Sequence, residues 1–111
     1  MKIFTDDEMN ALLAAAKPYS MVILKQGPNF ADDTAPAIIW EHGRRNFGLR
    51  QDGVLAVVLP VADGSEVCGV GVFTGTVDDT IVVMNDDPGV QAGVLTFEVH
   101  PCRGLPGDSL V

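Results

Sequence analysis

The chain is poor in basic residues and in long apolar runs. Seven Lys and Arg residues stand against fifteen Asp and Glu, a formal net charge of −8 at pH 7. Binding to a nucleic-acid backbone requires clustered Lys and Arg, and Arg44-Arg45 is the only basic pair, so we expect no nucleic-acid partner. No apolar run approaches the roughly 18–20 residues that cross a bilayer. Residues 1–7 lack the basic-then-apolar layout of a signal peptide, so we expect a cytoplasmic protein without membrane contact.

Cysteine is scarce, and several cofactor and catalytic motifs are missing. Cys68 and Cys102 show neither CxxC spacing nor a neighbouring His pair, which argues against a metal site. In a cytoplasmic protein the two thiols are expected to be free. The chain contains no P-loop, no dinucleotide fingerprint and no nucleophile elbow. These absences lead us to expect neither a metal nor an organic cofactor.

The remaining composition indicates one globular domain. The chain has 111 residues, of which 47% are apolar and 20% charged. That length fits a single compact unit. We divide it into an N-terminal helical extension (1–18), a main domain (19–103) and a C-terminal tail (104–111).

Capping and periodicity place the helices. Thr5 and Glu8 form a capping box before an apolar repeat at helical spacing. A second helix is expected from Asp33-Thr34 to Asp52-Gly53, with Pro36 just inside its start. Thr76 to Asp79 resembles another capping box and predicts a third helix that ends before Asp87-Pro88. The β-branched residues 80–83 favour a strand at this point, but the cap, the acidic first turn and the proline favour a helix.

Four strands complete the pattern. We predict them at 19–25, 54–62, 67–73 and 95–101, the middle two joined as a hairpin. The resulting order after the first helix is βαββαβ, which indicates an α+β, ferredoxin-like fold with a four-stranded antiparallel sheet. The hairpin strands are apolar on both faces, and a monomer would leave one face exposed. We therefore expect a homodimer that packs sheet against sheet, since the N-terminal helix is too short to cover this face.

Several of these segments carry a family resemblance. The most specific is Asp87-Pro88 with Ala92-Gly93, which matches an Asp-Pro-(aromatic)-x-x-Ala-Gly pattern, although Gly89 occupies the aromatic position. Weaker matches are spread over the main domain: the first strand with Gly27-Pro28, His42, Leu59-Pro60-Val61, Thr76-Val77-Asp78-Asp79 and Val99-His100-Pro101. Together they resemble the YCII-like (YCII-related) proteins of the dimeric α/β-barrel superfamily. The resemblance implies a His–Asp active site, and the missing aromatic implies a widened or altered pocket.

His42 and Asp87 are the candidate catalytic pair. His42 follows Ile38 and Ile39 at helical spacing and should lie at the core boundary, where it is either a packed histidine or a general acid–base. Asp87 would accept from one ring nitrogen and leave the other facing the substrate. The alternatives are a plain turn residue at Asp87, or Asp86 as the partner.

Arg45 and Asn46 share the helix face of His42 and are candidate substrate-binding residues, or simply solvated helix residues. We read His100 as structural or exposed. The combination predicts proton transfer on a small organic substrate, of the elimination or isomerisation type, because no nucleophile accompanies the pair. The alternative is a non-catalytic dimeric module that binds a small ligand or a protein. Cofactor-free oxygenation is a third possibility, by analogy with other dimeric α/β barrels.

Overall fold

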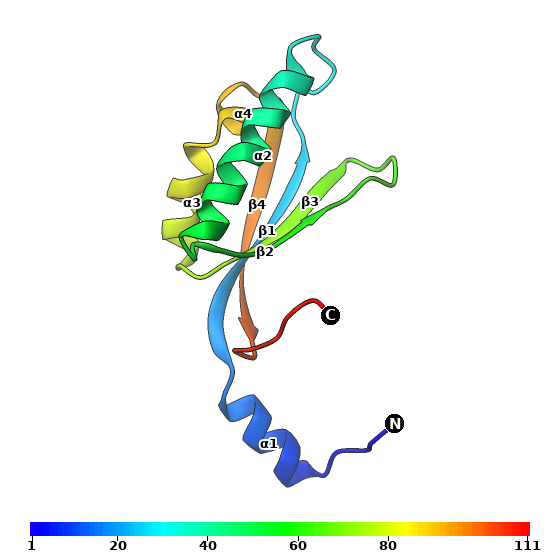
Figure 1. Ribbon diagram of the computed structural model, residues 1–111, viewed down its shortest axis with the longest axis vertical. Helices are drawn as coiled ribbons and strands as arrows, with labels where there is room; N and C mark the ends of the chain where they lie inside the picture. The colour runs from blue at the N-terminus through cyan, green and yellow to red at the C-terminus, as the bar shows by residue number, and fades with distance from the viewer.

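The computed structural model describes residues 1–111 as an α+β protein with an open, antiparallel, four-stranded sheet (Figure 1). The sheet order is β2-β3-β1-β4. The elements are α1 (Asp6–Ala14), β1 (Lys17–Gln26), α2 (Ala35–Gln51), β2 (Leu55–Pro60), β3 (Val67–Phe73), α3 (Val77–Asn85), α4 (Pro88–Gln91) and β4 (Leu95–Gly104). The α+β class and the antiparallel sheet predicted from the sequence are confirmed.

The helices form one layer and the sheet forms the other. Helices α2 and α3 lie on the same face of the sheet, where α3 packs on β4 and β1 and α2 contacts β2, while the β2–β3 hairpin projects away from the helices (Figure 1). The core lies between the two layers, where Val22, Leu24, Met84, Val94 and Leu95 are almost fully buried. The helices therefore cover the β2–β3 hairpin less than they cover the strands under α3.

Helix α3 forms against its local strand propensity. The Thr76 side chain accepts a hydrogen bond from the Asp79 backbone N–H at 3.1 Å, and Asp78 and Asp79 occupy the first turn. Acidic residues there interact favourably with the helix dipole. Thr80 also bonds the Thr76 carbonyl at 2.8 Å and is buried, and so is Met84. Capping and burial of one face together outweigh the β-branched run.

Pro88 begins a helix as well as following one. The sequence predicts only a turn after Asp87, but residues 88–91 form the short helix α4, with Asp87 as its N-cap. Proline is favoured at the first helical position because its missing N–H would have no intrahelical partner there. Asp87 is consequently fixed by the helix that follows it, as well as by its place after α3.

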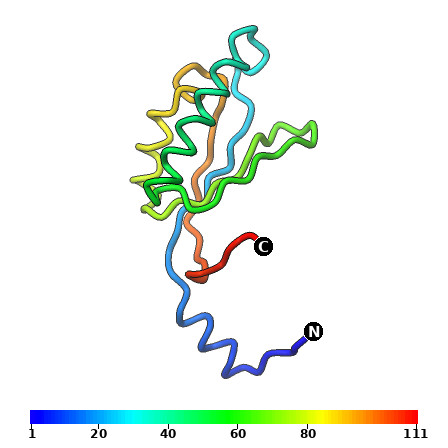
Figure 2. The backbone as a smooth tube through the Cα atoms, viewed as in Figure 1, coloured from blue at the N-terminus to red at the C-terminus, as the bar shows by residue number.

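Helix α1 extends away from the rest of the molecule. The predicted capping box between Thr5 and Glu8 is present, but α1 has no buried residue. Figure 2 shows it continuing beyond the lower end of β1, at the end of the molecule where the C-terminal residues also lie. The longest dimension of the chain is accordingly 55 Å, against 28 and 21 Å for the others.

The sheet face opposite the helices is open, and it is apolar over β2, β3 and most of β1, while β4 contributes Thr96, Glu98 and His100 to it. Strand register places Val57, Val72 and Met21 in one row across it, and Leu59, Val70 and Ile23 in the next. None of these side chains is fully buried, and Leu59 is 41% exposed. An apolar sheet face of this kind is what the sequence predicts.

The two cysteines are free thiols, as predicted. They lie on β3 and β4, and β1 separates these strands in the sheet.

Candidate active site

His42 and Asp87 are joined by a buried hydrogen bond. His42 Nδ1 lies 2.8 Å from Asp87 Oδ1, within the distance predicted from the sequence. Helix α2 supplies the histidine, which is 8% exposed, and the junction of α3 and α4 supplies the aspartate, which is 0% exposed. The alternative partner, Asp86, is exposed.

The backbone of α4 holds the Asp87 carboxylate in a fixed direction. Its second oxygen, Oδ2, accepts hydrogen bonds from the N–H groups of Gly89 at 2.9 Å and Val90 at 3.2 Å. Burial by itself would raise the pKa of Asp87, but the His42 hydrogen bond and charge, with the two backbone donors, lower it below its ordinary value. The carboxylate is therefore ionised at neutral pH.

An ionised Asp87 determines which nitrogen of His42 carries the proton. A carboxylate can only accept hydrogen bonds, so the short contact requires a proton on His42 Nδ1. The neutral ring then has its lone pair on Nε2. This nitrogen lies 3.1 Å from Asn46 Nδ2, one helical turn further along α2, and the amide N–H can donate to it. The nitrogen expected to face the substrate is thus already in contact with Asn46.

Arg45 points to a different place from Asn46. Its Nη2 donates to the Val83 carbonyl in α3 at 2.7 Å, and its Nη1 lies 3.7 Å from Asp87 Oδ1 without making a hydrogen bond. Arg45 does not line the pocket beside His42, whereas Asn46 does. Of the two predicted substrate-binding residues, the structure places Asn46 at the pocket and Arg45 next to the buried carboxylate.

A cavity of about 510 Å³ opens beside His42. It lies between α2 and the helix-facing side of the β2–β3 hairpin. Three glycines border it, Gly43 on α2 and both Gly69 and Gly71 on β3. A Cβ at Gly43 would meet no atom within 4 Å, whereas a Cβ at Gly71 would lie 3.2 Å from Leu55 Cδ1, so only Gly43 faces open space. Its lining is mostly apolar, with Ile39, Phe47, Val58, Leu55, Phe73 and Met84 among its residues.

The lining of this pocket was not predicted, although the sequence contained a signal for it. Gly43 adjoins His42, and Gly69-x-Gly71 lies in a strand, where glycine weakens the sheet unless something approaches closely or space is required. Only the packing of α2 over β3 brings these glycines to one cavity.

Gly89 does not widen the pocket, contrary to the expectation from the missing aromatic. It is buried and lies outside the pocket lining. A Cβ at this position would lie 2.6 Å from Leu95 Cδ1 and 3.0 Å from Asp87 Oδ2. Leu95 and the capping carboxylate already fill the space that an aromatic side chain would need.

Cys68 lines the same pocket and is its only thiol. Burial raises the pKa of this thiol above its ordinary value. The thiolate is the nucleophilic form, so a raised pKa disfavours covalent chemistry at Cys68.

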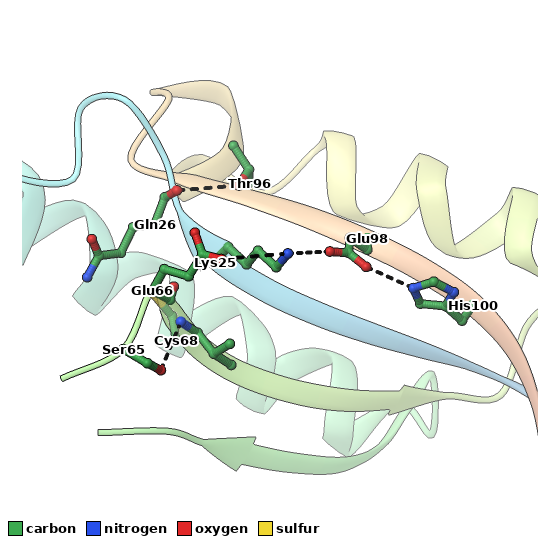
Figure 3. A network of polar contacts seen from close by, with 9 residues as sticks. Lys25, Gln26, Ser65, Glu66, Cys68, Thr96, Glu98 and His100 are labelled. Carbon is green, nitrogen blue, oxygen red and sulfur yellow. Dashed lines mark hydrogen bonds and ion pairs between the residues drawn. The ribbon is translucent and has the colours of Figure 1, made fainter. Parts of the chain in front are cut away.

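A separate polar network lies on the open face of the sheet. Lys25 pairs with Glu98, and His100 Nε2 lies 2.9 Å from the other carboxylate oxygen of Glu98 (Figure 3). The pKa of Glu98 is lowered, first by the Lys25 hydrogen bond and then by that of His100. His100 is exposed, as predicted, and is remote from the pocket because it faces away from the helices.

The fold and the site define an α+β protein with a buried His–Asp pair at the wall of an apolar pocket. No protein-family model matches the chain, and no curated protein matches its sequence significantly. No helix is both long and apolar enough to cross a membrane. No cluster of three or more His, Cys, Asp or Glu side chains is arranged to hold a metal ion.

Proposed function

We propose that this chain is a small enzyme in which His42, oriented by Asp87, transfers a proton on a small organic substrate bound in the adjacent pocket. The observation that supports this most strongly is the 2.8 Å contact between His42 Nδ1 and the fully buried Asp87 carboxylate, with the ring bordering the cavity. A base next to a concave apolar pocket, with a carboxylate behind it, is the usual arrangement for acid–base catalysis.

The geometry suggests how the proton would move. With Nδ1 protonated toward Asp87, the Nε2 lone pair takes a proton from the substrate, and the resulting imidazolium is stabilised by the carboxylate. His42 then returns the proton to another position or to a leaving group. Asn46 must release Nε2 when the substrate enters, and its amide can then bind a substrate oxygen. With the Cys68 thiol kept protonated, elimination or isomerisation fits the site better than a covalent mechanism.

We further propose a YCII-like, ferredoxin-like domain that dimerises through its sheets in the manner of dimeric α/β barrels. The sheet order β2-β3-β1-β4 and the open apolar face support this. A second copy on that face would remove the rows of Val, Ile, Leu and Met side chains from water. It would leave the helix-side pocket accessible.

The test begins with a ligand-shift stability screen of small carbonyl compounds and lactones on the wild type beside His42→Ala. Compounds that stabilise the wild type are then assayed by NMR in D2O for catalysed exchange of carbon-bound hydrogen. We expect exchange with the wild type, at least about a hundredfold less with His42→Ala, and no loss with the control Gly48→Ala. Equal exchange by His42→Ala and the wild type would rule out His42 as the base.

A non-catalytic small-ligand-binding module is the second candidate, favoured by one observation. Asn46 already satisfies His42 Nε2 at 3.1 Å, so the pair could be a self-contained structural network in the pocket wall. Saturable binding of a compound without any catalysed exchange would favour this function.

A further inference from the structure

We infer that the pocket takes an uncharged, largely apolar molecule carrying a single hydrogen-bonding group that lies against His42 and Asn46. The inference rests on the proposed function in that it assigns a substrate class to the same site. The charge and the polarity of the pocket wall support it.

The wall lacks a permanent counter-ion for any charged ligand. Its polar residues are His42, Asn46, Gln26, Ser65 and the Cys68 thiol, and it contains no Lys, Arg, Asp or Glu. Behind the wall, Arg45 donates to Val83 and lies next to Asp87. The Asp87 carboxylate is 0% exposed and is engaged by His42 and the α4 backbone. A ligand charge buried here would be unpaired, which is strongly unfavourable.

The net charge of the chain also disfavours the binding of anions. A chain with a formal charge of −8 repels an approaching carboxylate or phosphate, and no basic patch lines the pocket mouth to offset that field.

The polar groups that could orient a ligand meet at His42. Its Nε2 and the Asn46 amide lie 3.1 Å apart on α2 and both border the cavity. A hydroxyl or carbonyl can replace one partner of this contact, because the hydroxyl donates to Nε2 and either oxygen accepts from the amide. One such group suffices to orient the ligand, and the rest of its surface meets aliphatic and aromatic side chains.

Gly43 permits a direct test of where the ligand lies. Gly43 follows His42 in the sequence and lines the pocket. A Cβ at this position would meet no atom within 4 Å. Gly48 lies on the same helix, also has nothing within 4 Å of a Cβ, but does not line the pocket. Both positions accept a Cβ, and leucine favours the helix over glycine. Gly43→Leu and Gly48→Leu are therefore matched variants, of which only Gly43→Leu places a side chain at the pocket wall.

The experiment titrates 2-naphthol, 2-naphthoate and 2-naphthylmethylammonium into the wild type, Gly43→Leu, Gly48→Leu and Asn46→Ala, followed by ¹H–¹⁵N NMR. These probes share one ring system and differ in charge. We expect 2-naphthol to bind the wild type at least about tenfold more tightly than either ion. Gly43→Leu should lose that binding, Gly48→Leu should keep it, and Asn46→Ala should weaken it severalfold.

Four outcomes would overturn the inference. They are equal or tighter binding of either ion, undiminished 2-naphthol binding by Gly43→Leu, full affinity in Asn46→Ala, and no detectable binding of 2-naphthol at millimolar concentration. The same measurements distinguish failure of the ligand class from failure of the proposed catalytic function. Selective 2-naphthol binding without catalysed proton exchange would end the catalytic proposal and leave the ligand class standing. Selective binding of 2-naphthoate would overturn the ligand class and leave proton transfer open.

Discussion

Asp87 contacts two residues of α2 and the backbone of α4 while being shielded from solvent. One oxygen accepts from His42 Nδ1 at 2.8 Å and lies 3.7 Å from Arg45 Nη1, and the other accepts from the α4 backbone. An orienting residue needs this kind of fixation, because a carboxylate free to rotate could not hold one imidazole tautomer. The same contacts make Asp87 important for stability.

The lowered pKa of Asp87 predicts a pH-dependent stability contribution. A group whose pKa is lower in the folded protein than its unfolded value of about 3.9 stabilises the fold above that value. The contribution is lost as the pH falls through the folded-state pKa. Urea unfolding from about pH 6 to about pH 2 should show a steeper acid loss in the wild type than in Asp87→Asn, which keeps a capping side chain. Identical acid slopes would contradict this assignment.

Catalysis by a coupled pair predicts non-additive mutations. Once a substrate is found by the screen above, Asp87→Asn should lower the rate by disturbing the tautomer and charge behind His42, and His42→Ala should lower it further. The double variant should be little slower than His42→Ala, because Asp87 acts only through the imidazole. Multiplication of the two single-variant losses, measured as kcat/KM, would show that they act independently.

Much at this scale could be predicted from the sequence, because helix periodicity and an Asp-Pro junction fix backbone positions. Together with the family resemblance, they predict that His42 and Asp87 lie close to each other. The contact of Asn46 with Nε2 and the rotation of Arg45 toward Asp87 could not be predicted. Both depend on side-chain rotamers, and the partner of Arg45, Val83 on α3, is distant in the sequence.

Among the elements, the short helix α4 is the one that fixes the position of Asp87 in the site. Its N-cap is Asp87, and its buried Gly89 packs against Leu95 at the start of β4. The sequence predicts a turn here because four helical residues are too few to show periodicity. Helix α3, by contrast, is predicted correctly from its cap and acidic first turn.

Gly89→Ala should destabilise the protein by about 1–3 kcal/mol, because the added Cβ would overlap Leu95 Cδ1, at 2.6 Å, in a packed core. Gly48→Ala, at an open helix position, should instead stabilise by up to about 1 kcal/mol. Chemical denaturation of both variants measures the difference. Equal effects would show that the space around residue 89 can relax at no cost.

At the scale of the whole molecule, the apolar open face of the sheet and the projecting helix α1 are the features that one chain leaves uncovered. Strand alternation predicts the face, since a strand apolar at every position must be apolar on both sides. The position of α1 could not be predicted, because its sequence specifies a capped amphipathic helix without specifying what it packs against. The pocket also appears only at this scale, from glycines on separate elements.

The proposed dimer predicts a defined response to a charge on the open face. Sedimentation should show a dimer at micromolar concentration, burying more than about 1,200 Å² in total. Val72→Asp should yield a folded monomer, because Val72 lies in the row with Met21 and Val57 that faces away from the core. Val82→Asp, at a 63% exposed position on helix α3 outside this face, serves as the control and should stay dimeric. A monomeric wild type would contradict the assembly.

We propose that Asp87 fixes His42 with Nδ1 protonated and Nε2 available to a ligand. Long-range ¹H–¹⁵N NMR of the histidine rings tests it directly, since the chain has two histidines and His42→Ala identifies the signals. We predict that the neutral His42 ring carries its proton on Nδ1, and that adding 2-naphthol shifts its Nε2 resonance while Asp87 keeps Nδ1 protonated. A neutral ring protonated on Nε2, or an Nε2 resonance that does not respond to a ligand bound in the pocket, would contradict the account.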